Sequence, residues 1–306
     1  MDKKDNQILP YLSLNIRKRL KSFEDNFWDK LTNIRINVNS PVILELGVER
    51  CYLSDCETTL QVSKAYFATP SDIADIYELI TASSAYAYAH SINEGYVTLP
   101  GGNRVGVSGN CSMEGGKIKC VKEIYAFNFR IAHEILGVSE LVLSDIYVGG
   151  DIKNTLIISP PGCGKTTMLR DIARSLGSIE KIGKIKQCAI IDERNEIACL
   201  HNGTSQMDIG ANNFVISNCL KSVAVPIVAR SMSPDVIVID EMCDKKDFDS
   251  ALYAKQAGCK IVASVHGKDE FVNEMNNAGY RNFFDTTIIL SNKKGPGTIE
   301  KILTGG

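Results

Sequence analysis

A loop that can bind phosphate is the clearest chemical feature of the sequence. The apolar run Thr155 to Ser159 is typical of a buried strand, and a helix is expected over 165–176, with Gly177 as its C-cap. The Pro/Gly-rich loop between them ends in Gly-x-Gly-Lys-Thr, a form in which backbone amides turn toward a polyphosphate. The residues expected to bind phosphate are Ser159, Pro160, Pro161, Gly162, Cys163, Gly164, Lys165, Thr166 and Thr167.

The residue types in this loop indicate how it would bind a nucleotide. The Lys165 ammonium can reach the β- and γ-phosphates, and the Thr166 hydroxyl can ligate Mg²⁺. The helix N-terminus adds the positive end of its dipole. Ser159 stands where the usual motif has its first glycine, so only the second half of the motif is intact. Cys163 is expected to be a tolerated residue in an exposed position of the loop.

Two acidic residues end a second apolar run. Val236 to Ile239 is followed directly by Asp240 and Glu241. An aspartate at the end of a strand beside a phosphate loop can hold Mg²⁺ and its water shell, and the adjoining glutamate can polarise an attacking water. The pair would therefore add hydrolysis to binding. The alternative is that the two acids only favour solubility at a strand end.

Charged side chains also follow other predicted strands of the same sheet. Asp192, Glu193 and Arg194 come directly after one apolar run, and His266 ends another. Ligands of open α/β sheets collect at the carboxyl ends of the strands. Glu193 and Arg194 are therefore candidates for a catalytic role or for a structural ion pair, and His266 for a sensor of the γ-phosphate or a structural histidine. Arg230 could stabilise transition-state charge, in cis or across a subunit boundary, or simply pair with an aspartate.

The hydrophobic pattern changes near residue 141. After it, strand-like runs alternate with helical stretches, which favours an α/β domain with a mainly parallel sheet over 141–306. Before it, alternating runs and tight turns predict a smaller α+β domain over 1–140. Apolar residues recur at helical spacing from Leu9 to Leu31, which predicts one amphipathic helix there.

Composition excludes several classes of protein. The 306 residues suggest two domains, and 34 basic against 36 acidic side chains give a net charge of −2, so a nucleic-acid partner is not expected. No apolar run reaches the length of a membrane span, and the N-terminus lacks the pattern of an export signal. The ten cysteines include no CxxC pair and are expected to be reduced core thiols rather than zinc ligands. Together these features predict a cytoplasmic protein.

Several of these segments, taken in order, resemble the stage III sporulation protein AA family. The resemblance runs from about Leu9 to beyond His266 and rests on segments 95–109, 128–132, 159–171, 192–194, 230–235 and 240–241. That family is similar to the ATPases of type II secretion, type IV secretion and pilus machines. The resemblance implies a RecA-like P-loop ATPase core behind a smaller N-terminal domain, assembled as a homo-hexamer.

The resemblance also implies a cellular role and further site residues. The protein would act in the mother cell of an endospore-forming bacterium, with membrane-embedded secretion-like sporulation proteins as partners that hold it at the membrane. His266 matches the histidine box of the secretion ATPases, and Arg230 matches an arginine of their Arg-x-x-Pro-Asp segment, here spaced Arg-x-x-x-Pro-Asp. Arg104 and Arg130 are further candidates, because N-terminal-domain arginines can reach the nucleotide in such enzymes.

Three functions follow as hypotheses. The leading one is a Mg²⁺-dependent ATPase that energises or assembles a channel from mother cell to forespore, by movement of its N-terminal domain against the core. The second is a nucleotide-gated assembly scaffold with little turnover, against which the intact Asp240-Glu241 pair argues. The third is a RecA-like nucleic-acid motor, against which the net charge and the lack of a basic stripe argue.

Overall fold

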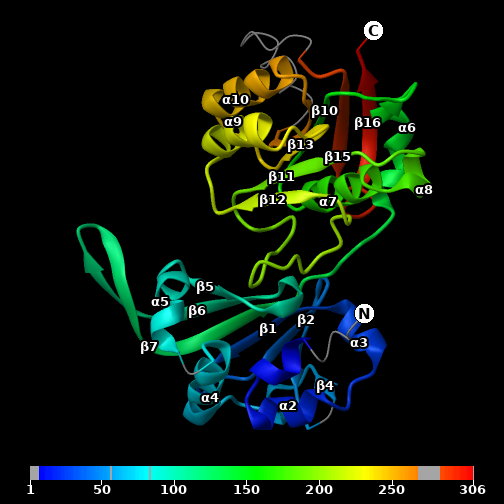
Figure 1. Cartoon of the computed structure of the whole chain (residues 1–306). Helices are drawn as coiled ribbons and strands as arrows, with labels where there is room; N and C mark the ends of the chain where they lie inside the picture. Colours follow the sequence, from blue (N-terminus) through cyan, green and yellow to red (C-terminus); the bar gives the residue numbers. More distant parts are fainter. Residues whose placement is uncertain (1–6, 56, 83, 268–282, 306) are drawn as a thin grey trace. The chain divides into compact units, whose positions relative to one another are not determined.

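The chain forms two compact units, Met1–His133 and Glu134–Gly306, in a computed structural model (Figure 1). The structure describes residues 7–55, 57–82, 84–267 and 283–305. Each unit has its own sheet and its own hydrophobic clusters.

The segment just after the division belongs to the second unit. The backbone amides of Gly137 and Ser139 donate to the buried carboxylate of Asp171, at 3.1 and 2.7 Å. Asp171 lies on the helix that follows the phosphate loop, and its side chain also accepts from Arg174. The boundary predicted after residue 140 therefore falls inside the second unit, because this polar network ties residues 137–139 to that helix.

The first unit is built on an antiparallel sheet with strand order β4-β3-β2-β1-β7-β6-β5. Its strands are β1 (Leu31–Asn37), β2 (Ile43–Leu46), β3 (Glu49–Leu53), β4 (Thr58–Thr59), β5 (Tyr96–Thr98), β6 (Arg104–Glu114) and β7 (Lys117–Arg130). Its helices are α2 (Leu14–Leu20), α3 (Asp25–Lys30), α4 (Pro70–Ile80) and α5 (Ala85–Asn93), with short 3₁₀ turns η1 (Leu9–Tyr11), η2 (Val62–Lys64) and η3 (Pro100–Gly102).

The amphipathic helix predicted from Leu9 to Leu31 is wrong as a single helix. The structure divides it into η1, α2 and α3, although the apolar stripe is buried as the spacing requires. The break before α2 falls at Ser13, which has extended ψ and whose Oγ donates to the carboxylate of Asp72 at 2.5 Å. A polar contact to a distant helix thus competes with continuation of the local helix.

Asp72 is the polar centre of the first unit. It is fully buried near the start of α4, where it forms a capping box with Thr69, and it also accepts from the Tyr66 hydroxyl at 2.6 Å. Burial alone would raise the pKa of Asp72, but the hydrogen bonds from Ser13, Tyr66 and Thr69 outweigh it and lower that pKa. Burial and the bond to Asp72 raise the pKa of Tyr66 to about 12.

The second unit is an α/β layer structure with strand order β12-β11-β13-β14-β10-β15-β16. Within this sheet, over the residues that the structure describes, the strands pair in parallel except for β15 with β16, which are antiparallel. The strands are β10 (Thr155–Ser159), β11 (Cys188–Asp192), β12 (Phe214–Ser217), β13 (Val236–Ile239), β14 (Lys260–His266), β15 (Thr286–Ser291) and β16 (Thr298–Thr304). The helices are α6 (Leu143–Ile146), α7 (Lys165–Leu176), α8 (Ile179–Ile182), α9 (Lys221–Ser231) and α10 (Lys245–Gln256), with η4 (Val138–Leu141) and a small ribbon of β8 (Tyr147–Val148) and β9 (Asp151–Ile152).

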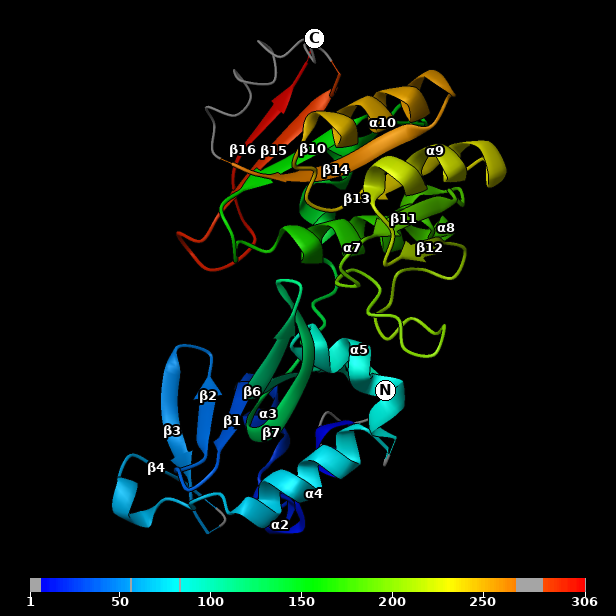
Figure 2. The ribbon, with the colours of Figure 1, turned by 90° about the vertical axis from the view of Figure 1, so that its left-hand side faces the viewer.

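Helices cover both faces of this sheet, with α7 on one face and α9 and α10 on the other (Figure 2). The central strands are therefore apolar on both sides: in β13, Val236 and Val238 pack into the cluster of α7, while Ile237 and Ile239 pack into the cluster of α9 and α10. The phosphate loop and the acidic pair follow directly after two of these strands, β10 and β13. In the part of the chain that the structure describes, no helix combines the length and the apolar character that crossing a bilayer requires.

Candidate functional site

The predicted phosphate loop connects β10 to α7 through two glycines with positive φ. Gly162 has φ 74° and Gly164, the N-cap of α7, has φ 84°. Both values lie in the left-handed region, which glycine adopts without the steric cost that a Cβ brings. Lys165, Thr166 and Thr167 then form the first turn of α7, as the sequence predicts. The loop residues from Ser159 to Thr167 are therefore continuous with a strand end and a helix N-terminus, the context that phosphate binding needs.

The Lys165 side chain is folded back onto this loop. Only 5% of Lys165 is exposed, and its Nζ donates to the backbone oxygens of Ser159 and Pro160 at 3.0 and 3.2 Å. The same ammonium lies 2.9 Å from Nδ1 of His266. Burial lowers the pKa of Lys165, and the nearby charges of Asp240 and Glu241 oppose that effect.

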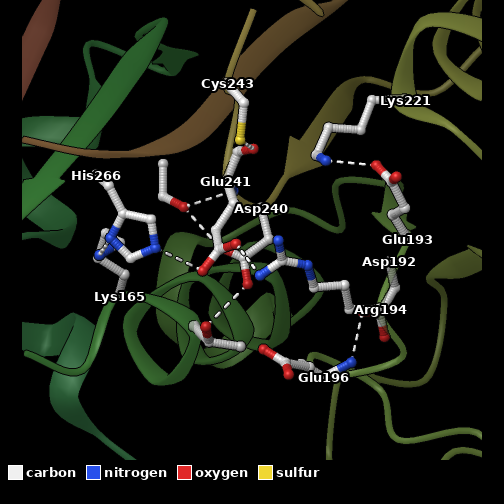
Figure 3. Close-up of polar contacts among 12 residues, drawn as sticks. Lys165, Asp192, Glu193, Arg194, Glu196, Lys221, Asp240, Glu241, Cys243 and His266 are labelled. Atoms are coloured by element: carbon white, nitrogen blue, oxygen red, sulfur yellow. Dashed lines mark hydrogen bonds and ion pairs between the residues drawn. The ribbon is translucent and has the colours of Figure 1, made fainter. Parts of the chain in front are cut away.

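His266 links the lysine to the acidic pair. Its Nε2 lies 2.7 Å from Oε1 of Glu241 (Figure 3). Because Nδ1 faces an ammonium, which can only donate, Nε2 carries the proton and donates to Glu241. The other carboxylate oxygen of Glu241 accepts from Arg194. Lys165, His266, Glu241 and Arg194 thus form one chain of polar contacts.

Asp240 and Glu241 adopt different environments although they are adjacent. Asp240 is 9% exposed and accepts from the Thr166 hydroxyl at 2.8 Å and from Ser264 at 2.6 Å. Burial raises the pKa of Asp240 in spite of these two bonds. The backbone turns at Glu241, whose φ is 51°, and its amide donates to the Ser264 hydroxyl at 3.0 Å. The turn directs the two carboxylates to different partners.

Thr166 and Asp240 fit a magnesium ion by the chemistry of their oxygens. A hydroxyl and a carboxylate are hard ligands, and Mg²⁺ is usually held by one or two carboxylates together with waters and substrate phosphates. A buried carboxylate is also stabilised by a cation at this position. Among the residues that the structure describes, no group of three or more His, Cys, Asp or Glu side chains forms a site that protein ligands alone would complete.

The loop after β11 is held rigidly beside this cluster. Asp192 is 1% exposed, and its carboxylate accepts from the amides of Glu196, Ile197 and Ala198. From α7, the buried Arg170 donates to the backbone oxygens of Ile197 and Glu196 at 2.6 and 2.7 Å. The conformation of the loop that carries Arg194 is therefore stabilised by two side chains, Asp192 at the end of β11 and Arg170 of α7.

Glu193 and Arg194 take part in separate ion pairs. Glu193 pairs with Lys221, a largely buried lysine at the start of α9, while Arg194 pairs with Glu241 itself. The sequence left open whether Glu193 and Arg194 are catalytic or form structural ion pairs. In the structure each of them forms an ion pair. The pair of Arg194 includes a predicted catalytic carboxylate, so it bears directly on the site.

Two predicted residues lie differently from expectation. Cys163 is 3% exposed and packs in the hydrophobic cluster of α7, so its predicted exposed position is wrong. Arg230 lies in the last turn of α9, with its Nε on the carbonyl oxygen of Pro226 at 3.1 Å. Because α9 runs antiparallel to β13, its start lies near the cluster and Arg230 lies at the amino end of the strands. Within one chain, Arg230 is therefore not part of the cluster.

Ser264, Arg170 and Lys221 were not identifiable as site residues from the sequence. Ser264 is a fully buried residue inside the strand β14, where a lone serine among apolar residues is the only sequence signal. In the sequence, Arg170 and Lys221 look like ordinary basic residues of helices.

The candidates Arg104 and Arg130 belong to the first unit. They face each other across β6 and β7, and Arg104 stacks on Tyr96.

Comparison with solved structures places the fold among ATPases. The pilus retraction motor PilT, solved with bound ADP, superposes with a TM-score of 0.58 at 15% identity, over 92% of this chain and 77% of that one. The ATPase DotB of Legionella pneumophila gives a TM-score of 0.54 at 13% identity, over 85% of this chain and 72% of that one. At this identity the likeness concerns the fold, and it confirms the α/β ATPase-like architecture that the sequence predicts.

Sequence comparison identifies the family. The stage III sporulation protein AA of Bacillus subtilis (strain 168) is 34% identical over 302 residues, which are 97% of this chain and 94% of that protein. An uncharacterized protein, ycf45, of Cyanidium caldarium is 28% identical over 51% of this chain and 46% of its own length. The family model described as "Sporulation stage III, protein AA" matches residues 1–305. The chain therefore belongs to the sporulation stage III protein AA family, as the resemblance of its motifs predicts.

Proposed function

We propose that the protein is a Mg²⁺-dependent ATPase whose site lies at the carboxyl ends of β10, β13 and β14. The observation that carries the proposal is the 2.8 Å hydrogen bond between Thr166 and Asp240, which joins the phosphate loop to the acidic pair across 74 positions of sequence. The α/β fold shared with PilT and DotB supports the same function.

The residues of the site would divide the work of phosphoryl transfer. Lys165 would release the carbonyl oxygens of Ser159 and Pro160 and bind the phosphates instead. The backbone amides from Gly162 to Lys165 would donate to the same phosphates. Thr166 and Asp240 would hold Mg²⁺, which when bound neutralises charge on the phosphate oxygens. Because Lys165 is buried, its charge acts in a poorly solvated site, where an electrostatic interaction is stronger than in water.

Glu241 would orient and polarise the attacking water. In the structure both of its carboxylate oxygens are engaged, one by His266 and the other by Arg194. Each of these oxygens keeps a second lone pair, with which it could accept a hydrogen bond from the attacking water. Withdrawal of Lys165 toward the phosphates would free Nδ1 of His266, and the imidazole would then be able to respond to the γ-phosphate.

The family suggests where this activity is used. We propose a homo-hexamer in the mother-cell cytoplasm, held at the membrane by membrane-embedded secretion-like sporulation proteins. There it would energise or assemble the channel to the forespore. Arg230, which lies away from its own site, would be available to a neighbouring subunit. The family match and the fold shared with a pilus retraction motor support this role.

Two variants test the assignment of Lys165 and Glu241. Lys165→Ala should abolish ATP binding measured by calorimetry, whereas Glu241→Gln should bind ATP but release no phosphate. Glu140→Gln, which makes the same chemical change at an exposed carboxylate of η4, should match the unsubstituted protein in both assays. Normal turnover by Glu241→Gln would show that Glu241 is not the base.

A second function, a nucleotide-gated scaffold with little turnover, is favoured by one observation. Both carboxylate oxygens of Glu241 accept from side chains, His266 and Arg194, and these contacts compete with the water that hydrolysis needs. A scaffold would bind ATP with high affinity and release phosphate no faster than Glu241→Gln. An ATPase would release phosphate faster than that variant by orders of magnitude.

A further inference from the structure

The loop between β15 and β16, residues 292–297, lies directly against the phosphate loop; we refer to it as the hairpin loop. The amide of Gly297 donates to the carbonyl oxygen of Cys163 at 3.0 Å. A Cβ built on Gly164 would lie 3.2 Å from the nitrogen of Gly297 and 3.7 Å from the carbonyl carbon of Pro296. Figure 2 shows the same proximity, with the red hairpin loop beside the green loop that leads into α7.

The order of the strands determines which end of a nucleotide would meet this loop. In the sheet, β10 lies between β14 on one side and β15 on the other. Asp240, Glu241 and His266, which would face the terminal phosphate, all come from β13 and β14. If a triphosphate occupies the phosphate loop with its terminal phosphate toward β13 and β14, the rest of the molecule extends away from those two strands. Its nucleoside end therefore lies toward β15 and the hairpin loop.

The part of the hairpin loop that lies against the phosphate loop, Pro296 and Gly297, carries no charged side chain, whereas Lys293 and the exposed Lys294 lie earlier in the loop. Lys293 is turned back along the hairpin, where its Nζ lies 2.6 Å from the carboxylate of Glu300. Pro296 is exposed, so it presents an apolar ring surface next to the phosphate loop. The loop cannot retreat freely, because Gly297 is bonded to Cys163 and the Cys163 side chain is buried in the core. A fixed apolar surface of this kind can pack against the flat face of a base.

We propose that the hairpin loop, through Pro296, forms the wall of the nucleoside subsite and packs against the base and ribose of a bound nucleoside triphosphate. This inference rests on the proposed function, since it assumes that the phosphate loop binds the triphosphate. Contact with the hairpin loop would allow the protein to bind a nucleotide more tightly than a polyphosphate that has no nucleoside.

Paired ligands separate the two ends of the site. The full-length chain is titrated by calorimetry with MgATP and, separately, with magnesium tripolyphosphate, which has the phosphates but no nucleoside. Pro296→Ser, which removes the apolar ring without adding charge, should weaken MgATP about fivefold and leave tripolyphosphate unchanged. The control is Ile185→Ser: Ile185 is 53% exposed and precedes β11, at the amino ends of the strands and away from the phosphate loop.

Each other outcome contradicts the proposal. Unchanged MgATP affinity in Pro296→Ser would show that the ring does not contact the nucleoside. Equal weakening of both ligands would show that the loop supports the phosphate loop rather than the nucleoside. Equal affinity of the unsubstituted protein for the two ligands would leave no nucleoside subsite to assign. If the unsubstituted protein binds neither ligand, the proposed function itself fails, and this inference fails with it.

Discussion

The left-handed backbone at Glu241 predicts an unusual ranking of two variants. With φ at 51°, the Cβ of residue 241 is in a conformation that costs about 1–2 kcal/mol in a residue other than glycine. Glu241→Ala and Glu241→Gly both remove the carboxylate and its contacts with His266 and Arg194. They differ only in the Cβ, so the glycine variant should be the more stable by about 1 kcal/mol.

Glu193, which precedes Arg194 in the chain and pairs with Lys221, supplies the control. Glu193 does not have positive φ, so Glu193→Gly should be less stable than Glu193→Ala by about 0.5–1 kcal/mol, the usual order. The sign of the Gly–Ala difference should therefore reverse between positions 193 and 241. Neither variant at position 241 should release phosphate.

The measurement is thermal unfolding monitored by scanning calorimetry. Tryptophan fluorescence is unsuitable, because the single tryptophan, Trp28, lies in the first unit and does not report on the second. For a unit of this size, about 1 kcal/mol corresponds to a shift of about 2–4 °C in the unfolding midpoint. If Glu241→Gly melts at or below the temperature of Glu241→Ala, residue 241 is not left-handed in solution. The turn would then not be what directs the two carboxylates to different partners.

Three further predictions concern buried polar residues. Asp72→Asn should lower the unfolding free energy of the first unit by about 2–4 kcal/mol, measured by urea titration with tryptophan fluorescence. Because the folded pKa of Asp72 is lowered, its contribution should be complete above about pH 4 and lost as pH falls through that folded pKa; an equally steep acid transition in Asp72→Asn would contradict this. Ser264→Ala should reduce phosphate release about 10- to 100-fold with little change in ATP affinity, since it removes a donor to Asp240; unchanged turnover would exclude a positioning role. Arg170→Met should reduce turnover about tenfold by loosening the loop that carries Arg194, and Arg170→Lys should restore part of it; no effect of either substitution would show that the loop holds its shape without Arg170.

The parts of the site that could be predicted from the sequence depend on local patterns. A buried parallel strand is apolar on both faces, so the first charged residues after Val236–Ile239 mark where it ends. The helix over 165–176 follows from its glycine turn and its apolar periodicity, and the structure confirms those bounds. Parallel strands bring such ends to one edge, which is why Lys165, Asp240 and His266 could be expected together.

The parts that could not be predicted depend on contacts between distant segments. In the sequence, Ser264 is one small residue within an apolar strand. It lies beside Asp240 because of the register in which β13 pairs with β14. Cys163 is buried in a cluster that includes residues from segments far away in sequence, such as Val262 and Ile288. Similarly, the break at Ser13 depends on Asp72, 59 residues later. None of these contacts leaves a periodic signal in the sequence.

The central claim is that the phosphate loop and the acidic pair form a single site for ATP and Mg²⁺. A crystal structure of the protein with a non-hydrolysable ATP analogue and Mg²⁺ tests it most directly. The expected result is a metal ion next to both Thr166 and Asp240, with the Lys165 ammonium moved from the carbonyl oxygens of Ser159 and Pro160 to the phosphates. A nucleotide bound elsewhere, or Lys165 still folded onto its own loop beside a bound nucleotide, would contradict the claim.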